Sequence, residues 1–205
     1  MQILNSDGSE AEMCGNGARC FGNFAAALLH HDKTAPLPFE TMAGVVTATF
    51  EKDGNVTVNL TNPHSMQLFV LNADPTVGAD VHFLNTGVPH AVAFLDKLED
   101  LNISRLGAYL RYHEAFSPKG TNANFARILS PGHIAIRTYE RGVEDETLAC
   151  GTGACAAVVA SVLNDLTDEE VIVKLLGGEL SVRWDRKVNH VFLEGPAVKV
   201  FDGVL

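Results

Sequence analysis

The chain has 205 residues, of which 46% are hydrophobic and 20% charged, and this composition can bury a core in one domain or in two small ones. The net charge of -10 argues against a nucleic-acid surface or an anionic membrane as the main partner and favours a small polar ligand. The chain contains no apolar stretch long enough to cross a bilayer and does not open with a secretory signal, so we expect a soluble, cytoplasmic protein.

In the first part of the chain, the pattern predicts one helix followed by a strand hairpin. Residues 17–30 have the spacing and alanine content of a helix. Apolar and small residues alternate over 45–50, and the alternation resumes over 56–60 after Asp53-Gly54, which is a hairpin signal.

The second part contains two further helical patterns, around residues 104–108 and over 153–164, and a predicted strand over 133–139. The tail alternates in short segments separated by turn residues. These segments are residues 171–176, 180–184, 191–193 and 198–201. Strands therefore dominate, and most are expected to be joined by tight turns.

One motif occurs twice. Residues 10–18, EAEMCGNGA, recur as residues 146–154, ETLACGTGA, and each copy leads into an alanine-rich helix. Two copies at this separation predict a duplicated domain whose halves face each other across a cleft. Pro63 is a plausible crossover, which gives an N-terminal half over residues 1–62 and a C-terminal half over 63–195.

Cys14 and Cys150 occupy the same place in the two copies, at the start of a helix. The unpaired amides and positive dipole end found there stabilise a thiolate and lower the pKa of the thiol. If the two sulfurs flank one carbon atom, a thiolate can remove its proton while a thiol protonates the opposite face, which inverts a stereocentre without a cofactor. The neighbouring residues allow tight turns, cap the helices or bind an anion: Gly15, Asn16, Gly17, Gly151, Thr152 and Gly153.

Other roles are open to the four cysteines. A cysteine at a helix start is often only a small buried residue, and we expect Cys20 and Cys155 to pack in this way. Zinc bound by all four is an alternative, although the spacings lack the usual Cys-x2-Cys unit, so no metal is expected. A Cys14–Cys150 disulfide is a further alternative and would be an oxidised, inactive form.

Two other features suit a small zwitterionic ligand. Glu140-Arg141 closes the strand predicted over residues 133–139, where a carboxylate and a guanidinium could hold an ammonium and a carboxylate, although a solvated surface pair is the alternative. His90, after Gly87-Val88-Pro89, is the histidine whose context stands out. The sequence contains no pyridoxal-phosphate lysine site, phosphate loop or dinucleotide fingerprint, so we expect no cofactor.

Taken together, residues 5–20 (NSDGSEAEMCGNGARC), Glu140-Arg141-Gly142 and residues 149–153 (ACGTG) closely resemble diaminopimelate epimerase. The resemblance implies cofactor-independent interconversion of LL- and meso-2,6-diaminopimelate, a step towards lysine and the peptidoglycan cross-link, with Cys14 and Cys150 as the two bases. It assigns the carboxylate at the reacting centre to Gly15, Asn16, Gly151 and Thr152, its amino group to Glu140, and the distal end of the substrate to Asn5, Asn122 and Arg141.

The resemblance also implies an α+β fold of two similar halves, each a mixed β-sheet curled around a central helix, with residues 196–205 returning to the first half. Family members begin further upstream, so we expect an incomplete first half that exposes edge strands and apolar surface around the Cys14 helix and allows a homodimer. Val88 stands where many members have an asparagine, whose role would pass to Asn85, Thr86 or main-chain groups.

Two alternatives to the epimerase remain open. The first is another cofactor-independent racemase, for example one acting on proline-type substrates, although such substrates would have no use for Glu140, Arg141 and Asn122. The second is a truncated, inactive copy that only binds a ligand or a partner.

Overall fold

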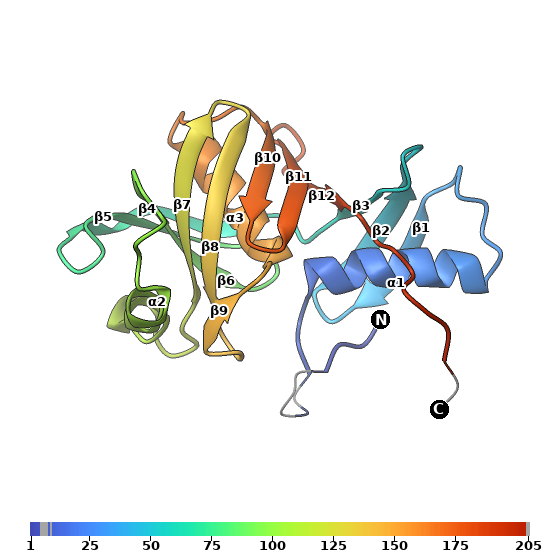
Figure 1. Cartoon of the computed structure of the whole chain (residues 1–205), viewed down its shortest axis with the longest axis horizontal. Coiled ribbons are helices and arrows are strands. Elements are labelled where there is room, and N and C mark those ends of the chain that lie inside the picture. The colour runs from blue at the N-terminus through green and yellow to red at the C-terminus, as the bar shows by residue number, and fades with distance from the viewer. Residues whose placement is uncertain (5–7, 9, 204–205) are drawn as a thin grey trace.

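The computed structural model describes residues 1–4, 8 and 10–203, and strands dominate it (Figure 1). The helices are α1 (Gly15–Leu28), α2 (Ile103–Arg111) and α3 (Gly151–Leu163), with a short 3-10 turn at Glu114–Phe116. The strands of the N-terminal part are β1 (Leu37–Thr41), β2 (Gly44–Phe50), β3 (Val56–Asn59), β4 (His64–Asp74), β5 (Ala79–Asn85) and β6 (Pro89–Phe94). The remaining strands are β7 (Asn122–Ser130), β8 (His133–Glu140), β9 (Asp145–Thr147), β10 (Glu170–Leu175), β11 (Gly178–Asp185) and β12 (His190–Gly195).

The strands form one long mixed sheet. Its order is β1-β2-β3-β12-β11-β10-β8-β7-β6-β5-β4, and β9 pairs with β8 at the side. Neighbouring strands are antiparallel except for β6 with β7 and β8 with β10. The pairing of β12 with β3, in register at Leu193 and Val58, joins the early strands to the late ones. The predicted α+β class is confirmed. The early strands β1–β3 and the later strands belong to one continuous sheet.

Helix α3 lies in the middle of the larger curl (Figure 1). Every residue from Gly151 to Val162 is buried, because alanines, valines and other small side chains cover the whole circumference of the helix. It packs against strands on several sides: β5, β6, β7, β8, β11 and β12. In the described part of the chain, no helix has the length and apolarity needed to span a membrane.

Helix α1 is covered on only one face, by β1, β2, β3 and β12. Gly22 lies so close to the sheet that a Cβ atom there would be 2.7 Å from the Ala48 side chain. On the uncovered face, Phe24 and Leu28 are 64% and 65% exposed, which agrees with the apolar surface expected around this helix. Cys20 also lies on the exposed face, so the prediction that it packs in the core is wrong, whereas Cys155 is fully buried as expected.

The predicted elements before residue 196 are confirmed with shifts at their ends. The hairpin is β2 and β3, and the three predicted helices are α1, α2 and α3. The prediction of a strand over residues 198–201 is wrong. This segment crosses α1 without pairing with a strand, and Val198, Val200 and Phe201 are 80%, 89% and 81% exposed, so alternation here does not reflect burial.

We propose the same division into halves as the sequence suggests, residues 1–62 with 196–205 and residues 63–195. Two contacts support the return of the tail to the first half. The Asn23 side chain of α1 donates a 2.7 Å hydrogen bond to the Ala197 carbonyl, and Ala197 is buried. The β3–β12 pairing then runs across the boundary between the halves.

Candidate active site

The two copies of the repeated motif meet in space at the N-termini of α1 and α3. A Cβ atom on Gly15 would lie 3.4 Å from the Gly151 Cα, and one on Gly151 would lie 3.3 Å from the Gly15 Cα. Leu193 packs against both positions, at 2.7 and 2.8 Å from the same hypothetical atoms. The Asn16 side chain adds a 3.4 Å hydrogen bond to the carbonyl of Ala149. Only glycine allows two helix ends to approach this closely.

Cys14 and Cys150 are the N-cap residues of these two helices, and both have an extended backbone. The Cys14 sulfur, which is half-buried, accepts a 3.3 Å hydrogen bond from the Gly17 amide. The Cys150 sulfur is buried and lies 3.6 Å from the Thr152 hydroxyl. The sequence therefore predicted the position of both thiols correctly, at matching helix starts.

Both cysteines open into one cavity of about 330 Å³. Its wall contains the described residues to which the family resemblance assigns catalysis or substrate binding: Cys14, Gly15, Asn16, Asn122, Glu140, Arg141, Cys150, Gly151 and Thr152. Asn5 lies outside the described residues. The cavity is large enough for a small amino acid, and it brings together parts of the chain separated by more than a hundred residues.

The electrostatics of the Cys150 thiol differ from the prediction made for a helix start. Burial raises the pKa of the Cys150 thiol to about 12, and the nearby Glu140 carboxylate adds to the effect, while the Thr152 hydroxyl and Gly153 amide oppose it. The expected lowering of the thiol pKa is therefore wrong for Cys150, because loss of water outweighs the helix end. In the substrate-free cavity Cys150 is a thiol.

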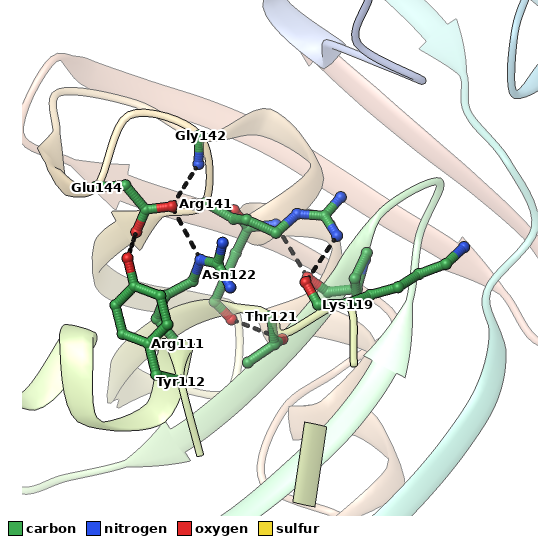
Figure 2. A network of polar contacts seen from close by, with 9 residues as sticks. Arg111, Tyr112, Lys119, Thr121, Asn122, Arg141, Gly142 and Glu144 are labelled. Atoms are coloured by element: carbon green, nitrogen blue, oxygen red, sulfur yellow. Dashed lines mark hydrogen bonds and ion pairs between the residues drawn. The ribbon is translucent and has the colours of Figure 1, made fainter. Parts of the chain in front are cut away.

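The opposite wall of the cavity is formed by the ends of β7 and β8. The Asn122 side chain accepts a 2.8 Å hydrogen bond from the Arg141 amide and donates one of 2.9 Å to the Pro89 carbonyl, so it fixes the start of the Arg141 turn (Figure 2). Arg141 donates to the Lys119 carbonyl at 3.4 Å. Burial raises the pKa of the Glu140 carboxyl, a cost that a neighbouring ammonium would relieve.

A buried polar network behind the cavity supports the start of α3. The Asn124 amide donates to His90 Nδ1 at 3.1 Å and to the Ala91 carbonyl at 2.9 Å, and its oxygen accepts from the Thr138 hydroxyl at 3.0 Å. A Cβ atom on Gly153 would lie 2.4 Å from the Asn124 oxygen, so the network touches the first turn of α3. Asn124 and Thr138 were not singled out from the sequence, since a buried amide has no local signature.

The burial of His90 in this network predicts how the free energy of unfolding depends on pH. Burial, with the positive charge of Arg141, lowers the pKa of His90 from 6.5 to about 3. Between these two pH values the unfolded chain binds a proton at His90 that the folded chain does not bind. As the pH decreases through this range, His90 therefore lowers the free energy of unfolding by up to about 1.4 kcal/mol per pH unit. We expect the His90 imidazole to remain neutral by NMR at about pH 5.5, and His90→Gln to reduce the loss of stability on acidification. An imidazolium at that pH would contradict the prediction.

The structure also adds residues that sequence reasoning missed. Glu10, Glu12 and Arg111 line the cavity, and Arg111 comes from the end of α2, where no local motif indicates a functional role. Val88 forms an apolar part of the wall. Neither of the two side chains suggested as substitutes for an asparagine at this position lines the cavity. The Asn85 side chain accepts a hydrogen bond from the Gly87 amide at 2.8 Å, and the Thr86 hydroxyl donates one to the Thr152 carbonyl at 2.9 Å.

Comparison with known proteins agrees with this geometry. The sequence model of the family described as diaminopimelate epimerase matches residues 1–66 and 82–200. The chain belongs to the diaminopimelate epimerase family. The diaminopimelate epimerase of Hydrogenobaculum sp. strain Y04AAS1 is 44% identical over 208 residues, covering 99% of this chain and 73% of that protein. The diaminopimelate epimerase of Aquifex aeolicus strain VF5 is 44% identical over 100% of this chain and 73% of its own length.

Solved structures share the fold of this diaminopimelate epimerase family member at low sequence identity. A probable proline racemase from Agrobacterium radiobacter K84 superposes with a TM-score of 0.66 at 18% identity, covering 95% of this chain and 68% of that one. A PhzF-family phenazine biosynthesis protein of Bacillus anthracis superposes with a TM-score of 0.65 at 15% identity, covering 92% of this chain and 74% of that one.

Among the described residues, no group of three or more His, Cys, Asp or Glu side chains is placed to hold a metal ion.

Proposed function

We propose that this protein interconverts LL- and meso-2,6-diaminopimelate by inverting one α-carbon between Cys14 and Cys150. The observation that carries the proposal is the pair of N-capping cysteines at two touching helix ends, both facing one cavity. Membership of the family and the names of the relatives at 44% identity support the same reaction.

The helix ends suit the carboxylate at the reacting centre. Helix geometry leaves the first amides of α1 and α3, at Gly15-Asn16 and Gly151-Thr152, without acceptors inside their helices. Two sets of N–H groups, each at a positive dipole end, would bind one carboxylate from both sides. Such donors also stabilise the negative charge that the carboxylate gains when the adjacent carbon loses its proton.

The remaining charges suit a substrate with two zwitterionic ends. Three carboxylates and two guanidiniums line the cavity, at Glu10, Glu12, Glu140, Arg111 and Arg141. Glu140, whose carboxyl pKa is raised by burial, would be stabilised as a carboxylate by the α-ammonium of the substrate. We propose that Arg141 binds at the distal end and that Asn122 and Asn5 assist there.

The chemical step requires one thiolate and one thiol. The thiolate takes the α-proton, the electron pair left on carbon is delocalised into the carboxylate, and the thiol on the opposite face gives its proton to that carbon. We propose Cys150, whose thiol pKa is raised to about 12 by burial, as the proton donor in the substrate-free protein, and Cys14 as the base because the mechanism needs one on the other face of the carbon. After the product leaves, the thiol and the thiolate have changed places between the two cysteines. Proton exchange with water then restores the starting state. The chain's own groups supply both proton transfers, so we propose that no cofactor takes part.

In this proposal the protein acts in the cytoplasm, on the route to lysine and to the peptidoglycan cross-link, with diaminopimelate as its small-molecule partner and the homodimer as its assembly. Nucleic acids and membranes are not among the proposed partners.

The test is incubation of the purified chain with LL-diaminopimelate and, separately, with L-proline, followed by chiral chromatography. We expect the meso isomer from the first substrate and no D-proline from the second. D-proline without meso-diaminopimelate would assign the protein to another racemase activity. A folded, monodisperse protein that produces neither would indicate an inactive copy.

A further inference from the structure

Arg111 is a second cation in the wall of the active-site cavity, after Arg141. It belongs to α2, which carries none of the residues given a catalytic or binding role above. It is the last residue of α2, and only 17% of its side chain is exposed. Its Nε donates to the Glu144 carboxylate at 3.0 Å. Its two terminal nitrogens have no hydrogen-bond partner among the described residues, and Arg111 lines the cavity together with Gly142 and Arg141.

The surroundings hold this guanidinium in place (Figure 2). Glu144 also accepts hydrogen bonds from the Gly142 amide and the Tyr112 hydroxyl, both at 3.1 Å. Burial by itself favours the neutral acid, but these hydrogen bonds and Arg111 outweigh it and lower the pKa of Glu144. The Tyr112 ring lies 4.7 Å from the guanidinium carbon. Glu144 is therefore a carboxylate that orients Arg111.

Gly120 makes room for the same side chain. A Cβ atom there would lie 2.1 Å from Arg111 Nη1 and 2.6 Å from the Arg111 carbonyl, and the backbone has φ of +66°. A larger residue at position 120 would displace the guanidinium. The carboxylate, the aromatic ring and the glycine together hold one arginine at the cavity wall, and a guanidinium is well suited to bind a substrate carboxylate.

We propose that Arg111 binds the distal carboxylate of the substrate together with Arg141, and so helps select an amino acid with a second acidic end. The inference rests on the proposed function and deepens it. The distal position follows from the fold. Arg111 is tied through Glu144 to Gly142, next to Arg141, whereas the proximal carboxylate is assigned to the amides beside the two cysteines. Val88 offers no side-chain donor on its part of the wall.

A purely structural role would be the alternative, with Arg111 only tying α2 to the turn after β8. The variants Arg111→Met and Glu144→Gln separate the two roles, because Arg111→Met removes both the cation and the tie, whereas Glu144→Gln weakens the tie and keeps the cation. Arg127→Met is the matched control, since Arg127 forms an exposed pair with Glu99 and does not line the cavity.

The experiment measures kcat and KM for LL-diaminopimelate, with thermal melting of each variant. We expect Arg111→Met to raise KM about 10- to 100-fold with kcat within about 3-fold of wild type, the loss of one charge-assisted bidentate contact. Arg111→Lys should recover part of the loss, Glu144→Gln should raise KM much less than Arg111→Met, and Arg127→Met should match wild type.

Two results would overturn the inference. One is an unchanged KM in Arg111→Met. The other is an equal defect in Arg111→Met and Glu144→Gln that follows their loss of thermal stability, as a structural tie predicts. Absence of turnover by the wild-type chain would instead overturn the proposed function, and this inference with it.

Discussion

Replacement of either Cys14 or Cys150 by serine is expected to lower the rate of meso-diaminopimelate formation at least about 10³-fold, because each thiol performs a proton transfer that the other cannot reach from its own side. Serine keeps the shape of the N-cap but not the chemistry, since a hydroxyl is a far weaker acid than a thiol and hardly ionises in a buried site. The loss should appear in kcat, with substrate binding largely kept. Chiral chromatography of single-time-point reactions is sufficient to measure it.

Cys20→Ser is the matched control, because Cys20 lies on the same helix as Cys14 but on its exposed face. We expect its activity to remain within about 2-fold of wild type, as usual for an exposed substitution far from a site. If Cys20→Ser lost as much activity as Cys14→Ser, or if Cys150→Ser kept more than about a tenth of the wild-type rate, the two thiols would not have the roles proposed here.

Gly15→Ala and Gly151→Ala are expected to lower kcat about 10-fold. In each variant the new methyl group would lie 2.7 or 2.8 Å from the Leu193 side chain and about 3.4 or 3.3 Å from the facing glycine Cα. Leu193 can adjust, but the facing backbone can move only if the helix ends separate. The facing backbone must move by a few tenths of an ångström, and because a displacement of about 1 Å between catalytic groups costs about 10²-fold in rate, we expect a loss of about 10-fold.

Gly132→Ala provides the comparison for these variants. Gly132 lies in the turn between β7 and β8, and a Cβ atom there meets nothing within 4 Å. Wild-type kcat is expected for this variant. Normal activity in both Gly15→Ala and Gly151→Ala, in protein that melts like wild type, would mean that close approach of the helix ends is not needed for the reaction.

The cysteine pair could be predicted from the sequence because its signal is local and repeated. A helix start with glycines is visible in nine consecutive residues, and its recurrence implied two equivalent sites. The contact between Gly15 and Gly151 could not be predicted in this way. It depends on the β3–β12 pairing and on Leu193, which belong to the tertiary structure.

Residues that reach the cavity only through long-range packing could not be predicted either, because their position also depends on the tertiary structure. Arg111 ends an ordinary amphipathic helix, and nothing near it in the sequence indicates that this end reaches the cavity. Cys20 and the segment 198–201 show the converse. Their apolar surroundings in the sequence predicted burial, but no strand covers that face of α1 among the described residues, so the local pattern was misleading.

The thiol electrostatics show a similar limit. A helix N-terminus favours a thiolate, and the sequence reveals the helix. Burial and the Glu140 carboxylate act in the opposite direction and depend on the fold, and for Cys150 they dominate. The sequence motif shows the helix start at Cys150 but not the burial that keeps its thiol protonated before substrate binds.

The central claim is that the two thiols act on opposite faces of one carbon. The most direct test is the reaction of LL-diaminopimelate in deuterium oxide, stopped at low conversion, with deuterium at the α-carbon measured by mass spectrometry in product and recovered substrate separately. A two-thiol mechanism predicts deuterium in the meso product and almost none in the remaining LL substrate, because a different group returns the proton. Equal labelling of substrate and product, or an unlabelled product, would contradict it.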